Sequence, residues 1–274
     1  MLPDQLCIRD VQLRVARIER SQSFYHELIG LHALDSQPHA IGLAAAGSTA
    51  PIVRLTAVPG TTARPEYAIG LYHVAILYPE RASLAHVLTR LIAAHWPFSG
   101  FSDHGVSEAA YLSDPDGNGL ELYVDRPRAA WPRQDGRIGM YTRPLDVENL
   151  LRAADEGDER GPMIGHVHLH VSDLPAARRF YHEAIGFDIT QDSYPGALFL
   201  SAGGYHHHLG VNTWARTHAP PTSAGLMEWA LSLGSQAAVD ALDTRVEAMG
   251  YIVNRADTRV STTDPDGNAL AIAA

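Results

Sequence analysis

Cysteine is nearly absent from this sequence, since Cys7 is the only one in 274 residues. One thiol can form no disulfide within the chain and can supply no cluster of thiolate ligands to a metal. A disulfide framework and a thiolate metal site are therefore excluded.

Long apolar runs and dense basic stretches are missing as well. No run approaches the roughly 18 consecutive apolar residues of a membrane span, and the first ten residues show no signal-peptide pattern. The balance of 31 acidic against 21 basic residues comes without the Lys/Arg stripe of a nucleic-acid-binding face. We therefore expect a cytoplasmic globular protein that binds neither membranes nor nucleic acids.

Histidine, in contrast, is abundant, with 15 residues. His73 lies in an apolar stretch, residues 70–77, that is typical of a strand. Glu121 lies in a second such stretch, after the turn sequence Asp-Pro-Asp-Gly-Asn at residues 114–118. A histidine and a glutamate on two strands are part of a possible metal site, and a third ligand must come from elsewhere.

The sequence repeats itself after about 156 residues. Phe24-Tyr25-His26-Glu27 in the first half corresponds to Phe180-Tyr181-His182-Glu183 in the second. The Asp-Pro-Asp-Gly-Asn turn at 114–118 recurs at 264–268. The chain therefore consists of two similar halves, and each half divides again into two units.

Each unit begins with a strand and continues with a helix and short strands, which predicts βαβββ. The first strands are expected at residues 8–15, 70–77, 164–171 and 225–233, and the second and fourth helices at 80–95 and 235–249. This predicts an α+β fold with one domain at 6–125, a linker at 126–161 and a second domain at 162–274. A short helix could lie within residues 144–154 of the linker.

Four βαβββ units, Phe-Tyr in the first helix of each half, and Asp-Pro-Asp-Gly-Asn before a final strand resemble the vicinal oxygen chelate superfamily. Its tandem domains form cup-shaped incomplete barrels. The two-half arrangement and the stretch Tyr205–Trp214 are similar to its extradiol dioxygenases of the Bacillus type. The resemblance covers nearly the whole chain outside the linker. It implies cleavage of catechol or a substituted catechol by O2 at non-haem Fe(II), with Mn(II) as the other possible metal.

The resemblance also implies a ligand set of two histidines and one glutamate. His73 and Glu121 match two of the family positions in the second unit, and His166 matches the third position in the third unit. The first unit offers Asp10 instead, which leaves Asp10 with His73 and Glu121 as an alternative site. The fourth unit has Ala271 where Glu121 stands.

A site made of His73, Glu121 and His166 requires the second and third units to pair across the halves. One chain can do this if the first and fourth units also pair, and a dimer that exchanges halves could do it as well. A homo-oligomer is therefore one of the expected possibilities.

Further residues take their roles from the resemblance. His207 is expected to act as acid and base, and Tyr111 to hydrogen-bond a catechol oxygen. The residues expected to bind or surround the substrate are His104, His168, Asn212 and Trp214.

Two other functions stay open at this point. A glyoxalase-type lyase or isomerase would use Gln12 as a ligand and a second carboxylate in a last strand, where Ala271 stands. A non-enzymatic small-molecule-binding protein of the resistance type would lack the triad altogether.

Overall fold

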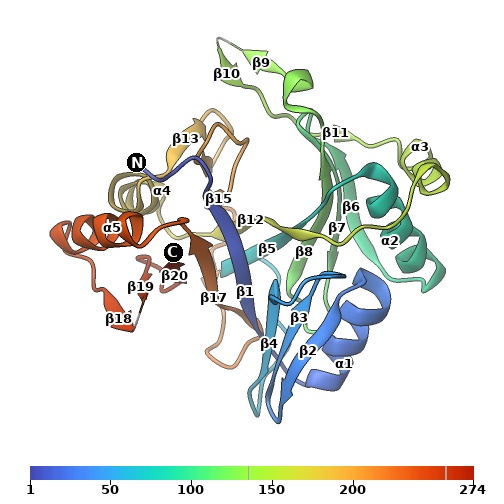
Figure 1. Ribbon diagram of the computed structural model, residues 1–274, viewed down its shortest axis with the longest axis horizontal. Coiled ribbons are helices and arrows are strands. Elements are labelled where there is room, and N and C mark those ends of the chain that lie inside the picture. The colour runs from blue at the N-terminus through green and yellow to red at the C-terminus, as the bar shows by residue number, and fades with distance from the viewer. Residues whose placement is uncertain (135, 257) are drawn as a thin grey trace.

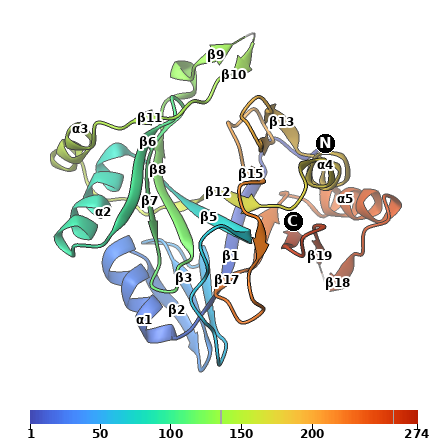
Figure 2. The same cartoon turned by 180° about the vertical axis from the view of Figure 1, so that it is seen from behind.

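The computed structural model describes residues 1–134, 136–256 and 258–274. Two curled sheets form its centre, and the longer helices lie on their outer sides (Figures 1 and 2). The expected α+β architecture of four βαβββ units in two tandem halves is confirmed.

The elements follow the expected order in all four units. The first unit contains β1 (Cys7–Val15), α1 (Ile18–Ser23), β2 (His32–Gln37), β3 (Ala40–Ala44) and β4 (Val53–Ala57). The second contains β5 (Ala68–Tyr78), α2 (Arg81–Ala93), β6 (Phe98–Asp103), β7 (Ser107–Ser113) and β8 (Gly119–Asp125). The third contains β12 (Met163–His170), α4 (Leu174–Arg178), β13 (Asp188–Gln191), β14 (Ala197–Ser201) and β15 (Leu209–Asn212), followed by β16 (Thr217–His218). The fourth contains β17 (Gly225–Ser232), α5 (Gln236–Ala248), β18 (Asn254–Ala256), β19 (Arg259–Thr263) and β20 (Ala269–Ala273).

The two sheets join units from different halves of the chain. One sheet has the order β18-β19-β20-β17-β1-β4-β3-β2, so the first and fourth units pair. The other begins with β11 (Arg143–Pro144) and has the order β11-β6-β7-β8-β5-β12-β15-β14-β13, so the second and third units pair. Both central contacts, β1 with β17 and β5 with β12, are antiparallel. The cross-half pairing therefore takes place within one chain, and no exchange between two chains is needed for it.

The Phe-Tyr motifs lie in π-helical turns that extend α1 and α4, at Phe24–Ile29 and Arg179–Ile185. Each turn ends at a glycine with a positive φ angle, 89° at Gly30 and 99° at Gly186. Glycine adopts this left-handed conformation without steric cost, which is why it terminates both helices.

The two repeated motifs contact each other inside each half. The Tyr25 hydroxyl donates to Asp114 at 3.3 Å, and the Tyr181 hydroxyl donates to Asp264 at 2.9 Å. Each tyrosine is in the first helix of its half, and each aspartate opens the turn before the last strand. These buried contacts tie the two units of a half together, while their strands pair with the other half.

The segment 126–161 crosses from one half to the other. It contains β9 (Arg133–Gln134), β10 (Arg137–Ile138), β11 (Arg143–Pro144) and α3 (Val147–Arg152), so the expected short helix is confirmed. Arg81 of α2 donates to Asn149 of α3 at 2.9 Å, and β11 pairs with β6. These contacts pack α3 and β11 against the second unit. In the described part of the chain, no helix is long and apolar enough to cross a membrane.

Candidate metal centre and its cavity

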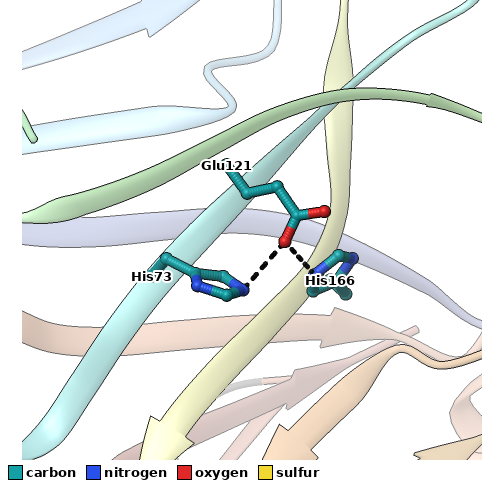
Figure 3. Close-up of side chains that lie close together, drawn as sticks. All are labelled: His73, Glu121 and His166. Carbon is teal, nitrogen blue, oxygen red and sulfur yellow. Dashed lines mark hydrogen bonds and ion pairs between the residues drawn. The ribbon is translucent and has the colours of Figure 1, made fainter. Parts of the chain in front are cut away.

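Three buried side chains from both halves of the chain meet at the junction of β8, β5 and β12 (Figure 3). Nε2 of His73 lies 3.0 Å from Oε2 of Glu121, and Nε2 of His166 lies 3.2 Å from the same oxygen. All three possible ligand atoms lie within 4.8 Å of one another. Among the residues that the structure describes, this is the group of metal-ligating side chains that could hold an ion.

Strand register explains why these side chains converge. Ala75 of β5 lies opposite Glu121 on one side and His166 on the other. His73 is two residues before Ala75 and so points to the same face of the sheet. Because alanine has only a methyl group, the row Glu121–Ala75–His166 leaves space between the two larger side chains.

The pairing of β12 with β5 is irregular at Gly165, directly before His166. The register of β12 against β5 shifts between Ile164 and His166. A Cβ atom on Gly165 would lie 1.8 Å from the hydroxyl oxygen of Tyr123, so only glycine fits there. The irregularity places His166 opposite Ala75 at the floor of the site.

Burial and mutual contact set the protonation states of this group. Burial lowers the pKa of His166 to about 4, although Glu121 opposes the shift. Burial also raises the pKa of Glu121, but the imidazoles of His166 and His73 outweigh it and hold that pKa well below its usual range. At neutral pH the site therefore offers a neutral imidazole and an ionised carboxylate, which are the forms that bind metals.

The polar atoms of the site fit a divalent cation. Nε2 of His73 is buried and makes no hydrogen bond, even though an oxygen of Glu121 is 3.0 Å away. Two imidazole nitrogens face one carboxylate oxygen, and a cation bound among the three would satisfy all of them. Two histidines and one carboxylate are a donor set for Fe(II) and related divalent ions.

The corresponding place in the other sheet is occupied by ion pairs. Asp10 of β1 is 3.1 Å from Arg54, and Glu228 of β17 pairs with Arg259. Gln12 donates to the Thr56 hydroxyl at 2.9 Å. Asp10 and Gln12 thus lie in the sheet of the first and fourth units and do not join His73 and Glu121. The alternative site built on Asp10 is therefore wrong.

A cavity of about 540 Å³ opens above the candidate metal centre. The cavity is lined by most of the residues that were expected at the site from the sequence. They are His73, His104, Tyr111, Glu121, His168, His207 and Trp214. His166 lies buried at the floor and Asn212 is fully buried, and neither is among the described residues that line the cavity.

Tyr111 and His104 form a fixed pair on the cavity wall. Nδ1 of His104 donates to the backbone carbonyl of Tyr141 at 2.8 Å, so its Nε2 carries the lone pair. The Tyr111 hydroxyl then donates to this Nε2 at 2.7 Å. Because its proton is committed to His104, the Tyr111 oxygen meets the cavity as a hydrogen-bond acceptor.

The linker supplies the third member of that chain, which was not expected from the sequence. Met140, Tyr141 and Thr142 all line the cavity. The group of Tyr141 that accepts the hydrogen bond from His104 is its backbone carbonyl. Every residue has a backbone carbonyl, so the sequence gives no signal for this contact.

Asn212 holds two histidines of β12 in place. Its amide nitrogen donates to Nε2 of His168 at 2.9 Å, and its carbonyl oxygen accepts from Nδ1 of His170 at 2.6 Å. The same oxygen also accepts from the backbone nitrogen of Trp214 at 3.1 Å. Asn212 therefore holds three residues that line the cavity, which are His168, His170 and Trp214.

His207 lies beside the floor of the cavity. Its ring centroid is 4.1 Å from that of His166 and 5.1 Å from that of Phe199. Burial, together with the neighbouring histidines, lowers the pKa of His207 well below its usual value. This imidazole is therefore neutral at neutral pH.

Comparison with known families gives one match that spans both halves. Residues 8–122 and 163–272 match the model of the glyoxalase/bleomycin resistance protein/dioxygenase superfamily. A catechol-2,3-dioxygenase from Bacillus subtilis strain 168 is 43% identical over 271 residues, which covers 94% of this chain and 93% of that protein.

Solved structures share the fold at low sequence identity. A putative dioxygenase from Bacillus subtilis has a TM-score of 0.71 at 13% identity, with 97% of this chain and 84% of that chain covered. Glyoxalase I from Zea mays has a TM-score of 0.61 at 17% identity, with 98% and 92% covered.

Proposed function

The chain belongs to the glyoxalase/bleomycin resistance protein/dioxygenase superfamily, and from that premise we propose that it is an extradiol dioxygenase acting on catechol or a substituted catechol. The observation that carries the proposal is the meeting of His73, Glu121 and His166 beneath the cavity. In the proposed reaction both atoms of O2 enter the product. The ring bond beside the two hydroxyl-bearing carbons breaks, and catechol becomes a hydroxymuconic semialdehyde.

In this proposal His73, Glu121 and His166 hold the metal, with Fe(II) as the main candidate and Mn(II) as the second. When bound, the ion supplies Lewis acidity toward the two catechol oxygens and redox chemistry toward O2. The buried, neutral imidazole of His166 and the ionised Glu121 are preset for binding, so folding itself prepares the ligand set.

The remaining residues position the substrate and move its protons. Tyr111 accepts a hydrogen bond from a catechol hydroxyl, because its own proton is given to His104. His207, neutral and at the cavity floor, takes up and returns a proton as acid and base. His168 and Trp214 contact the ring, and Asn212 acts by orienting both of them.

A glyoxalase-type reaction is the second candidate in this family, and the site does not favour it. That reading needs Gln12 as a ligand, but Gln12 is bound to Thr56 in the other sheet. It also needs a carboxylate where Ala271 stands, and the likeness to glyoxalase I at 17% identity extends to the fold alone.

The proposal is tested by anaerobic loading of the full chain with Fe(II), followed by catechol and O2. We expect a yellow ring-fission product, and no product from His73→Ala or His166→Ala. His39→Ala, at an exposed position, is the matched control and should keep full activity. Absence of product from the wild type with both Fe(II) and Mn(II), over a series of substituted catechols, would contradict the proposed reaction.

A further inference from the structure

A chain of hydrogen-bonded side chains leads from Asp125, at the partly exposed end of β8, to the cavity. The carboxylate of Asp125 is 2.9 Å from Nε2 of His206. Nδ1 of His206 is 2.7 Å from Nδ1 of His207. His207 in turn lines the cavity.

The three residues differ in their access to solvent. Asp125 stands at the end of β8 with a quarter of its side chain exposed, and it lies on the same face of the strand as Glu121. His206 is completely buried. Its ring is enclosed by Tyr205, at a centroid distance of 4.0 Å, and by Trp131, at 5.3 Å. His206 can therefore neither turn nor exchange its partners without disturbing this packing.

For a neutral imidazole at His206, the hydrogen bonds assign the proton of His207 to one nitrogen. An ionised carboxylate only accepts, so Nε2 of His206 must donate to Asp125. A neutral His206 then has its lone pair on Nδ1, where it accepts from Nδ1 of His207. Nε2 of His207 keeps the other lone pair, and among the described residues it has no hydrogen-bond partner.

We propose that Asp125 and His206 are positioning residues, which hold His207 with Nδ1 protonated and Nε2 as the proton acceptor of the cavity. This inference rests on the proposed function, because it assigns how the acid-base residue of that reaction is oriented. Asp125 and His206 do not touch the substrate and act only through His207. The arrangement follows the general rule that a catalytic histidine is set by the hydrogen bond at its other nitrogen.

The direct test reads the tautomer without any reaction. The full chain is labelled with 15N in its histidine rings and studied by long-range proton–nitrogen correlation, first metal-free and then with Zn(II), which is diamagnetic. The His207 signals are identified by their loss in His207→Gln. We expect protonated Nδ1 and unprotonated Nε2 in the wild type, and a mixture of tautomers in Asp125→Ala. A proton on Nε2 in the wild type, or an unchanged tautomer in Asp125→Ala, would overturn the proposal.

Kinetics of the Fe(II)-loaded protein give the second readout. Asp125→Ala and His206→Phe should each lower kcat about 10- to 100-fold, the usual effect of losing an outer partner of a site, with KM for catechol within twofold. The double variant should be no slower than His206→Phe alone, because both changes break one chain. Asp243→Asn removes a partly buried, arginine-paired carboxylate from the remote helix α5 and should change neither constant.

The two tests separate failure of this inference from failure of the proposed function. If the wild type cleaves no catechol, the tautomer of His207 still decides whether Asp125 and His206 position it. If it cleaves catechol and Asp125→Ala keeps the wild-type kcat, the positioning role is refuted while the dioxygenase proposal stands. Metal content is measured in each variant. If His206→Phe fails to fold, Asp125→Ala still tests the proposal, because Asp125 is at a partly exposed position.

Discussion

Replacing Tyr111 with phenylalanine removes a single hydroxyl group from the cavity wall. In the wild type this hydroxyl donates to His104 at 2.7 Å, and its oxygen faces the cavity as an acceptor. Loss of one hydrogen bond to the substrate costs about 1–2 kcal/mol. At 1.36 kcal/mol per tenfold change in rate, kcat/KM for catechol should fall about 5- to 30-fold.

The assay is steady-state ring cleavage by the Fe(II)-loaded protein, with Tyr111→Phe, His104→Gln and the double variant compared. Because the two residues form one hydrogen-bonded chain, the double variant should be about as slow as Tyr111→Phe alone. Tyr251→Phe, in the fourth unit, serves as the control for loss of a phenol and should leave kcat/KM unchanged. Rate losses that simply multiply in the double variant would refute the idea that His104 acts through Tyr111.

Two further predictions concern the cavity wall and a buried turn. In Gly210→Ala the new Cβ would lie 2.9 Å from the ring of His168, so the ring must move, and kcat/KM should fall at least tenfold. Gly139→Ala, in which the nearest atoms to the new Cβ are 3.8 Å away, is the control and should behave as wild type. Equal activity of the two variants would contradict the assigned role of His168. Burial raises the pKa of Asp114 from 3.8 to about 6, so the folded chain holds a proton that the unfolded chain loses between these values, and stability falls as pH rises through that window. The contribution is about 3 kcal/mol at 1.36 kcal/mol per pKa unit, and denaturant unfolding of the metal-free protein should show this fall in the wild type and its loss in Asp114→Asn. The same pH dependence in both proteins would show that Asp114 is not its source.

Much of the fold could be predicted from repeats and turn chemistry. The strand, helix and Asp-Pro-Asp-Gly-Asn signals recur in both halves, and the structure contains all four βαβββ units. The pairing of units could also be predicted, because at the ligand positions that the family resemblance implies, only the second and third units together supply two histidines and a glutamate. The domain limits at 6–125 and 162–274 stay a prediction, although the matches to the family model fall within them.

Other features left no trace in the sequence. The π-helical form of the turns after α1 and α4 depends on packing around Phe-Tyr, which residue spacing cannot distinguish from an ordinary α-helix. The contact between His206 and His207 joins neighbouring residues outside a regular strand, where alternation gives no guide to side-chain direction. Asn212 was expected to bind substrate, and its burial against His168 and His170 became visible only when β15 was placed beside β12.

The central claim is that both halves of one chain supply the metal ligands. Its most direct test is the amount of Fe(II) retained after anaerobic loading and desalting, compared among the wild type, His73→Ala, His166→Ala and Asp10→Asn. We predict one equivalent in the wild type and in Asp10→Asn, and nearly complete loss in both histidine variants. Full retention of iron by His166→Ala would contradict the claim, because the site would then belong to the first half alone.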